Sequence, residues 1–299
     1  MSHAREQRAG HIVTALWAAT LALAALASMM TFVARSDLAG EDLGIVLVGV
    51  ISGVLYASIG AIIVHRGRNA IGWILAGAGT GLVLLSFGST YAVIGFVTAP
   101  GSLPAPQHVA AATNWLFVPV TTSVAFMLFV FPTGTLPSPR WRPIVWVGVA
   151  AAVVTSLGFL LDPDAIEPVT GVSVSNPFGV AALGSLISTV LVGSVWVTCL
   201  AVVASIVALV VRYRRGGPEL RQQIKWLAFA AAFASACVVT ALASLVACNC
   251  DESALAGVMF FAFFLVLLLG VPAAIAIAVL KYGLFEIDVI ISKTVVYGV

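Results

Sequence analysis

Long uninterrupted apolar runs alternate with short polar segments along the whole chain. A helix that rises 1.5 Å per residue needs roughly 20 apolar residues to cross a hydrocarbon core about 30 Å thick. The runs lack the apolar/polar alternation of outer-membrane barrel strands, so they predict helices. We expect an all-α polytopic membrane bundle, with residues 1–281 as the membrane domain and residues 282–299 as a juxtamembrane tail. Its eight spans are predicted at 12–34, 43–64, 70–99, 114–131, 144–161, 180–211, 226–247 and 254–280.

Composition and charge strengthen this interpretation and orient the chain. Hydrophobic residues make up 61% of the 299 residues and charged residues 9%, whereas about 25% of a typical soluble domain is charged. Every Lys and Arg except Arg35 falls on one side of the predicted topology, and that excess marks cytoplasmic loops. We therefore expect the cytoplasmic membrane as the location, with both termini inside. The acidic residues predicted on the opposite side are Asp37, Glu41, Asp42, Asp162, Asp164, Glu167, Asp251 and Glu252.

The first span also has features of a signal peptide, with basic residues before it and small residues at Ala25-Leu26-Ala27. Its apolar run continues to Ala34, which is longer than a usual signal-peptide core. Retention of the span is the favoured interpretation, and cleavage is the alternative.

Small residues and prolines predict how the spans pack. Glycines spaced four apart let helix backbones approach closely, and we expect intramolecular packing at Gly49, Gly53 and Ala57 and at Gly77 and Gly81. A proline inside a span removes a backbone donor and kinks the helix. Kinks are therefore predicted at Pro119 and Pro272.

Catalytic chemistry is not indicated by the sequence. The predicted span cores contain no Asp, Glu, Lys, Arg or His, which are the usual marks of ion paths and proton relays in a membrane. Phosphate-loop, zinc-protease and nucleophile-elbow motifs are absent. We expect no enzyme activity, no cofactor and no metal site. A weak redox or metal-binding hypothesis attaches to Cys248 and Cys250, and the alternative is that they stand in an ordinary short turn.

Two cytoplasmic connections are more distinctive. Arg140-Trp141-Arg142 follows a turn punctuated by Pro and Gly, and Arg221 and Lys225 stand at the predicted start of the seventh helix. Arg and Trp near the bilayer surface pair with anionic headgroups. A solvated basic patch facing lipid is the simplest interpretation of both segments.

Four short segments, in the same order along the chain, resemble the membrane regions of multi-pass sensor histidine kinases from high-GC Gram-positive bacteria. Residues 69–73, NAIGW, are similar to the family's N-P-I-G-W, and residues 220–226, LRQQIKW, resemble R-Q-Q-[IL]-K-W. Residues 131–143, FPTGTLPSPRWRP, resemble F-P-D-G-R-L-P-S-x-R-W-R-P. Residues 282–298 are similar to Y-x-L-[FY]-D-I-D-x-x-I-N-R-T-L-V-Y-G.

The chain also departs from the family pattern. Thr133 and Thr135 replace the usual Asp and Arg, and the chain stops at Val299, before the further span and the kinase domains of that family. The resemblance implies a sensory signal-input module without catalytic domains, related to two-component signalling. The residues that it nominates for signal coupling are Arg140, Trp141, Arg142, Arg221, Lys225, Phe285 and Asp288.

The predicted partners follow from the same interpretation. We expect the lipid bilayer as the environment, a second copy of the chain and a separately encoded kinase or other signalling protein as candidate partners, and no nucleic acid. The alternative functions are a permease for small neutral solutes and a non-catalytic membrane scaffold or assembly protein.

Overall fold

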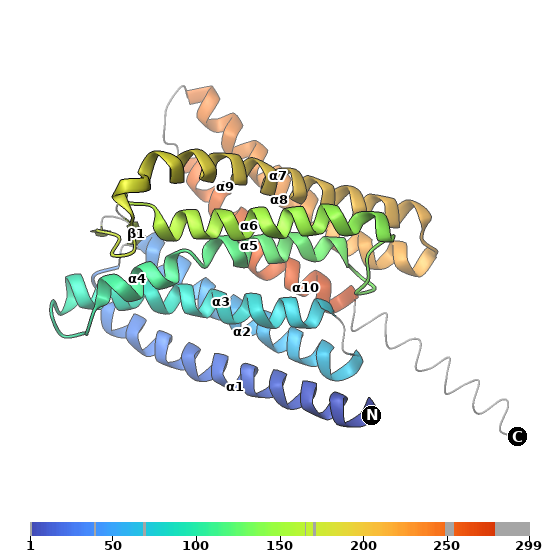
Figure 1. Ribbon diagram of the computed structural model, residues 1–299, viewed down its shortest axis with the longest axis horizontal. Helices are drawn as coiled ribbons and strands as arrows, with labels where there is room; N and C mark the ends of the chain where they lie inside the picture. The colour runs from blue at the N-terminus through green and yellow to red at the C-terminus, as the bar shows by residue number, and fades with distance from the viewer. Residues whose placement is uncertain are drawn as a thin grey trace, which may run out of the picture. The chain divides into compact units, whose positions relative to one another are not determined.

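The computed structural model describes residues 2–38, 40–67, 70–164, 166–169, 172–248 and 254–278 (Figure 1). Within these residues, 8 helical segments are long and apolar enough to cross a membrane. The predicted all-α polytopic fold and its number of spans are confirmed. The segments are Gln7–Ala34, Asp42–Arg66, Ala70–Thr98, Pro106–Phe129, Pro139–Leu161, Ala181–Arg215, Leu220–Ala241 and Ala254–Ala276.

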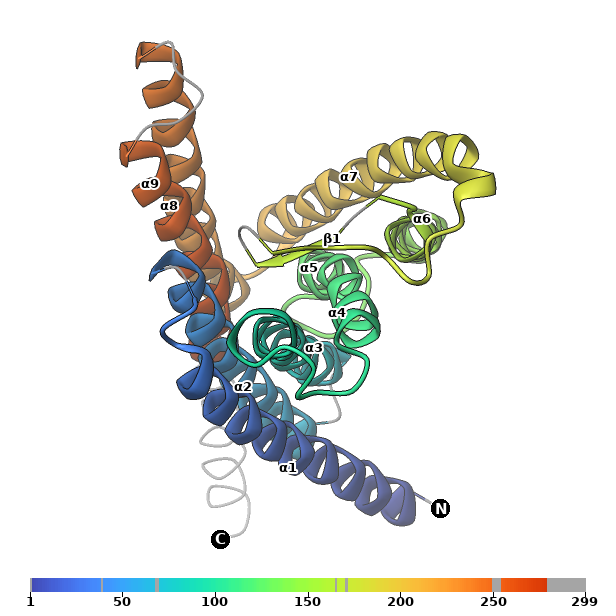
Figure 2. The ribbon, with the colours of Figure 1, turned by 90° about the vertical axis from the view of Figure 1, so that its left-hand side faces the viewer.

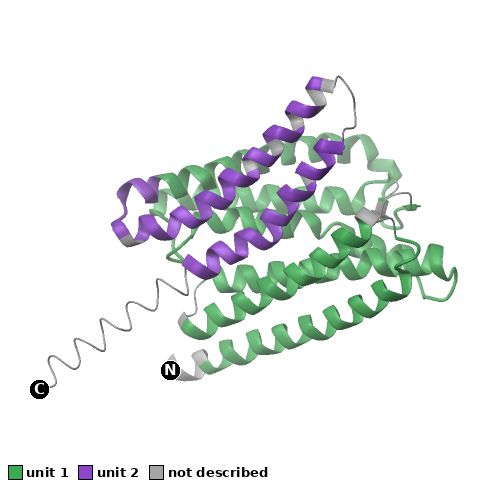
Figure 3. Cartoon of the chain, turned by 180° about the vertical axis from the view of Figure 1, so that it is seen from behind, with its two compact units in different colours: residues 1–210 green, residues 211–299 purple. Residues whose placement is uncertain are grey.

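The chain forms two compact units, Met1–Val210 and Val211–Val299 (Figure 3). The first unit begins with three long helices, α1 (Ser2–Ala34), α2 (Gly40–Gly67) and α3 (Ala70–Val93), which pack against one another. A π-helical turn, η1 (Ile94–Thr98), continues α3 without a break. These helices supply most of the buried apolar side chains of the unit, including the fully buried Tyr56.

Helices α2 and α3 approach closely enough for their backbones to touch. A methyl group added at Gly53 would lie 2.7 Å from the carbonyl oxygen of Gly79, and one added at Gly60 would lie 2.6 Å from that of Gly72. The predicted packing role of Gly53 is therefore confirmed. The predicted ridge on α3 is wrong at Gly77, because nothing lies within 4 Å of a methyl group at that position.

Hydroxyl groups join α1 to its neighbours inside the apolar region. The Trp17 indole nitrogen donates to Ser58 of α2 over 3.0 Å. The hydroxyls of Thr31 and Thr90 lie 3.2 Å apart across the interface between α1 and α3, and both side chains are buried. Polar contacts of this kind strengthen helix association in lipid. The first helix is thus a packed part of the unit.

The fourth span consists of two helices, α4 (Pro106–Asn114) and α5 (Phe117–Phe126), followed by a 3₁₀ turn, η2 (Met127–Phe129). The break at residues 115–116 lies one turn before Pro119, as expected for a proline that cannot donate to the carbonyl four residues back. The predicted start at residue 114 was too late. Pro106 begins the helix instead, since its fixed φ suits the first helical turn.

Helix α6 (Arg142–Leu161) follows a short 3₁₀ turn, η3 (Pro139–Trp141), and α7 (Gly184–Arg215) follows another, η4 (Ala181–Leu183). The two helices are linked by hydroxyl contacts, with Thr155 donating to Ser194 over 2.9 Å. Strands β1 (Ile166–Val169) and β2 (Val172–Val174) pair antiparallel between them. The predicted all-α fold included no strands, and this short pair is an addition to that expectation.

Helix α5 lies between α3 and α6 in two perpendicular views (Figures 1 and 2). This arrangement brings one face of α5 toward both neighbours and is the frame for the candidate site.

The second unit contains the end of α7 together with α8 (Pro218–Cys248), α9 (Ala254–Leu265) and α10 (Val271–Ala276). Helix α8 packs against α9 and α10. A π-helical turn, η5 (Val266–Gly270), immediately precedes the helix that contains Pro272. This irregular turn lies directly before the position of the predicted kink, because Pro272 has no amide hydrogen to donate to the preceding turn.

Candidate functional site

The structure describes five of the residues that the sequence nominates for signal coupling. Arg140, Trp141 and Arg142 form the junction between η3 and α6 in the first unit, whereas Arg221 and Lys225 lie in the first turns of α8 in the second unit. Phe285 and Asp288 lie outside the described residues.

The segment before Arg140 is a compact, well-anchored turn. Phe131 is fully buried, and the peptide bond from Phe131 to Pro132 is cis. Gly134 adopts a φ of 77°, which favours glycine, and its amide donates to the carbonyl of Val130 over 2.7 Å. The Thr133 and Thr135 hydroxyls lie 3.1 Å apart. The turn is therefore ordered by its own backbone and by one buried aromatic ring.

A row of three aromatic rings connects this turn to the interior of the unit. The Trp141 and Phe129 ring centroids lie 6.1 Å apart, and those of Phe129 and Phe126 lie 5.9 Å apart. Such distances fall in the range of favourable aromatic contacts. Phe129 is buried and Trp141 is partly exposed. Trp141 is thus coupled by ring contact to side chains in the core.

Two rings of this row, those of Phe126 and Phe129, form part of the wall of a pocket of about 330 Å³ between α3, α5 and α6. This volume is near the lower end of ligand pockets, which run from about 300 to 1,000 Å³. The wall residues come from α3, from α5 with the turn that follows it, and from α6. They are Ile74, Pro119, Thr122, Ser123, Phe126, Phe129, Val130, Val145, Val149, Ala152, Val153 and Ser156.

The three hydroxyl groups in the pocket wall already donate to carbonyls of their own helices. Thr122 donates to Val118 over 2.6 Å, Ser123 to Val120 over 2.8 Å and Ser156 to Ala152 over 2.7 Å. A hydroxyl carries a single hydrogen, so these side chains offer a ligand no further donor. The pocket consequently suits an apolar group rather than a polar solute.

Helix α6 contributes a continuous stripe of side chains to the pocket. Val145, Val149, Ala152 and Ser156 repeat at the spacing of three or four residues that keeps side chains on one face of a helix. Arg142 stands three residues before Val145, at the end of the same stripe, and its side chain is exposed. The apolar stripe therefore ends in a guanidinium group.

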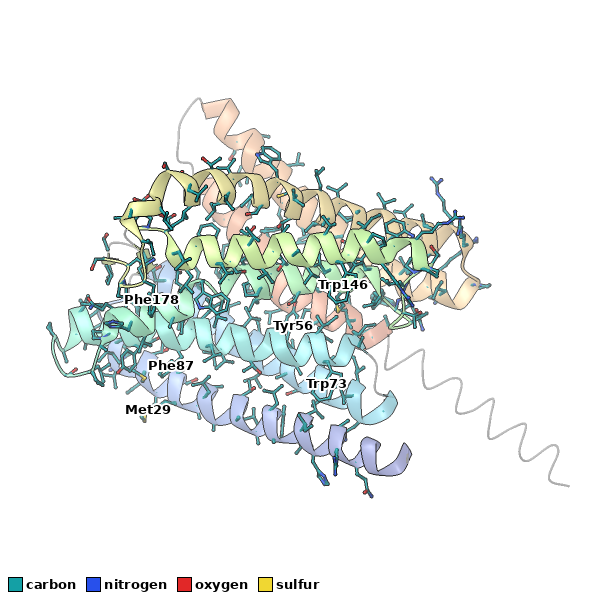
Figure 4. All side chains as sticks on the ribbon, viewed as in Figure 1. Met29, Tyr56, Trp73, Phe87, Trp146 and Phe178 are labelled. Carbon is teal, nitrogen blue, oxygen red and sulfur yellow. The ribbon has the colours of Figure 1, made fainter. Side chains whose placement is uncertain are left out.

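The outer surface of α6 carries large apolar side chains that are exposed. Trp146 is labelled in Figure 4 and is 71% exposed, and Val147 is also largely exposed. Large apolar side chains exposed on a membrane-spanning helix contact lipid tails, which are equally apolar. The pocket lining and this lipid-facing surface of α6 meet at Val153, which lines the pocket and is also exposed.

Arg221 closes the turn between α7 and α8. Its Nε donates to the carbonyl of Tyr213 over 3.1 Å and its Nη2 to that of Arg214 over 3.3 Å. The guanidinium carbon also lies 5.9 Å from the Tyr213 ring centroid. The last carbonyls of a helix lack partners within the helix and attract a positive charge. Arg221 therefore caps the carboxyl-terminal end of α7. The side chain of Lys225 is exposed.

Cysteine chemistry receives no support from the described residues. Cys199 and Cys237 are free thiols, exposed and buried respectively. Within the described ranges, no cluster of three or more His, Cys, Asp or Glu side chains is placed to hold a metal ion. Cys250 and the side chain of Cys248 lie outside what the structure describes.

Sequence reasoning found the turn but missed the pocket. Phe126, Phe129 and the α6 stripe were treated only as parts of spans. The available signal was the aromatic spacing in residues 126–131, FMLFVF, directly before the Pro- and Gly-containing turn. These three phenylalanines directly precede the turn, so their rings are placed to pack the turn against the helices.

Comparison with known proteins adds no assignment. No protein-family model matches the chain, and no match was found among curated proteins or among solved structures. Functional interpretation therefore rests on the turn, the aromatic row and the pocket that they adjoin.

Proposed function

We propose that the chain is a multi-pass sensory module, similar to the membrane input region of a two-component sensor histidine kinase. It occupies the cytoplasmic membrane with both termini inside, and it passes a change in helix packing to a kinase. The observation that carries the proposal is the contact between Trp141 and Phe129, because it links a family-like surface turn to the wall of an intramembrane pocket.

The proposed mechanism is a shift between two packings of α3, α5 and α6. A ligand shifts such an equilibrium only if it binds one packing more tightly than the other. A ligand in the pocket between these helices would bind the two packings with different affinities, because the volume of the pocket depends on the separation of the helices. Trp141 would then report the packing at the cytoplasmic surface.

The charge distribution supports the proposed direction of signalling. Arg66, Arg140 and Arg142 stand at span ends that the positive-inside rule assigns to the cytoplasm. The family-like segment at residues 220–226 follows the sixth span, and the alternation of eight spans assigns it to the same side. A cytoplasmic kinase would therefore meet all of these segments.

A fusion of the full chain, through Val299, to the catalytic region of a kinase from the resembled family tests the proposal. Trp141→Ala, Phe285→Ala and Asp288→Ala should each change autophosphorylation in vesicles by at least about fivefold, the lower range of allosteric coupling. Trp146→Ala is the matched control, because this exposed ring lines no part of the pocket. If all three variants phosphorylate at the rate of the unmodified fusion, the signalling role is wrong.

A further inference from the structure

The pocket between α3, α5 and α6 lies next to a cluster of positive charge. Arg142 ends the α6 stripe that lines the pocket, and Arg140 lies two residues earlier in η3. Both side chains are exposed. Trp141 stands between them and contacts Phe129 of the pocket wall. An apolar pocket with two guanidinium groups at one end matches a ligand with an apolar tail and an anionic head.

We infer that this pocket binds one acyl chain of an anionic phospholipid, with the lipid headgroup at Arg140 and Arg142. A phosphate or phosphodiester accepts hydrogen bonds from arginine in a bidentate geometry. Basic residues at the cytoplasmic surface of a membrane attract anionic lipid by about fivefold in affinity for each charge. The arginines therefore select the headgroup, and the pocket selects the position of the tail.

The depth of the pocket agrees with a single leaflet. Along α6 the lining runs from Val145 to Ser156, which corresponds to about 16 Å at 1.5 Å per residue. Half of a hydrocarbon core about 30 Å thick is about 15 Å. On α3, the lining residue Ile74 is only four residues from the start of the helix at Ala70, so it belongs to the same end as Val145. An acyl chain whose headgroup lies beside Trp141 would run along the lining to the middle of the bilayer.

The chemistry of the lining also favours a hydrocarbon chain over a polar solute. The hydroxyls of Thr122, Ser123 and Ser156 donate to backbone carbonyls, and the other lining side chains are apolar. Val153 lines the pocket and is 52% exposed. The pocket thus reaches the surface of α6 that meets lipid, where an acyl chain can enter sideways from the bilayer.

This inference deepens the proposed function, because it names the class of ligand that would shift the helix packing. Binding itself is independent of any kinase. An experiment on the purified chain therefore separates failure of the lipid site from failure of the signalling role, which the fusion measures.

The test uses the full chain in detergent micelles with a fluorescent phosphatidylglycerol probe. Unlabelled phosphatidylglycerol and phosphatidylcholine with identical acyl chains compete for the probe. Phosphatidylglycerol should bind about 25-fold more tightly, as two arginines at about fivefold each predict. Equal competition by the two lipids would overturn the proposal and would identify the site as a groove filled by any lipid.

Matched variants assign the two parts of the lipid. Arg140→Gln together with Arg142→Gln should abolish the headgroup preference, whereas Arg66→Gln, which removes an exposed arginine of α2, should retain it. If the double variant keeps the full preference, the headgroup is held elsewhere and the proposal is wrong.

A second pair of variants probes the tail. Val153→Trp fills the open side of the pocket and should weaken binding of both lipids by at least about tenfold, the effect of losing about two buried methylenes. Val154→Trp, at the neighbouring exposed position outside the lining, should bind like the unmodified chain. Because both valines are exposed, neither change disturbs the core. Unchanged binding by Val153→Trp would contradict occupancy of this pocket.

Discussion

Thr20 of α1 and Thr80 of α3 share a hydrogen bond inside the apolar region, with their hydroxyl oxygens 2.9 Å apart. Each oxygen also lies within donating distance of a carbonyl in its own helix, that of Leu16 at 2.8 Å and that of Ala76 at 3.0 Å. Because each hydroxyl has one hydrogen, two hydrogens serve three contacts. The bond between helices is therefore formed in competition with a backbone bond.

A modest coupling energy is expected between these two threonines. In a double-mutant cycle of Thr20→Val and Thr80→Val, the interaction energy should be about 0.6 kcal/mol, the average for hydrogen bonds between membrane helices. Reversible unfolding in mixed micelles measures it. Thr121→Val serves as the comparison, since Thr121 donates to carbonyls of its own helix, those of Phe117 and Val118. A cycle that closes to zero for Thr20 and Thr80 would mean that the backbone carbonyls hold both hydrogens.

Glycine positions on α3 should respond in opposite directions. Gly79→Ala places a methyl group against the backbone of Gly53 and Ala57, and overpacking of this kind costs about 1–3 kcal/mol. Gly77→Ala meets open space and should stabilise the helix by up to about 1 kcal/mol through the better helix propensity of alanine. The same unfolding assay compares the two. Equal effects would show that the close approach of α2 and α3 is absent in the membrane.

The difference between Gly77 and Gly79 illustrates how far sequence reasoning reaches in this protein. Span number and span position follow from hydropathy, since the length of an apolar run is set by the bilayer. Which face of a span meets protein does not follow, because lipid tails are as apolar as the side chains of a neighbouring helix. In the sequence, Gly77 therefore looked equivalent to Gly81, although a methyl group at Gly81 would meet the side chain of Val120 and one at Gly77 would meet nothing.

The candidate site shows the same division. Arg140, Trp141 and Arg142 are visible in the sequence because charge and aromatic residues stand out at a span end. The pocket is not, since Val149 and Ala152 look like any other residues of an apolar run. Its existence depends on the spacing of α3, α5 and α6, which is a tertiary property without a local signal. The break between α4 and α5 was partly predictable. Pro119 in the sequence predicted an interruption of the fourth span, but nothing near it predicted that α4 begins at Pro106.

Arg221 should stabilise the end of α7 through its two carbonyl contacts. Arg221→Ala is expected to lower the local stability by about 0.5 kcal/mol, within the range for a cation at an exposed helix end. Hydrogen exchange of the amides in residues 211–217 should then be about twofold faster. Arg221→Lys should restore only part of the protection, because an ammonium group cannot reproduce the planar, two-donor geometry of a guanidinium. Lys225→Ala should leave the exchange unchanged, and equal effects of both substitutions would contradict the capping role.

Thiol labelling can check the proposed orientation with residues that the chain already contains. A membrane-impermeant maleimide added to intact cells should label the connection that holds Cys248 and Cys250, and Cys248→Ser with Cys250→Ser should remove the signal. In that double variant, a cysteine introduced at the exposed Ser175 should be labelled from outside. One introduced at Ser138, in the turn before α6, should react only after permeabilisation. Labelling of Ser138→Cys in intact cells would reverse the topology.

We expect the first helix to be retained, because its small residues are deeply packed. Ala27, in the short stretch that resembles a cleavage site, is fully buried and packs with Ala24, Val50 and Val83. Signal cleavage requires an accessible, extended segment, whereas Ala27 lies within α1 (Ser2–Ala34). Removing the residues before Ser28 would also remove Thr20 and its contact with Thr80. The intact mass of the purified chain should therefore include the residues before Ala27. A mature chain that begins at Ser28 would contradict this, and it would require α2 and α3 to expose to lipid the surface that α1 now covers.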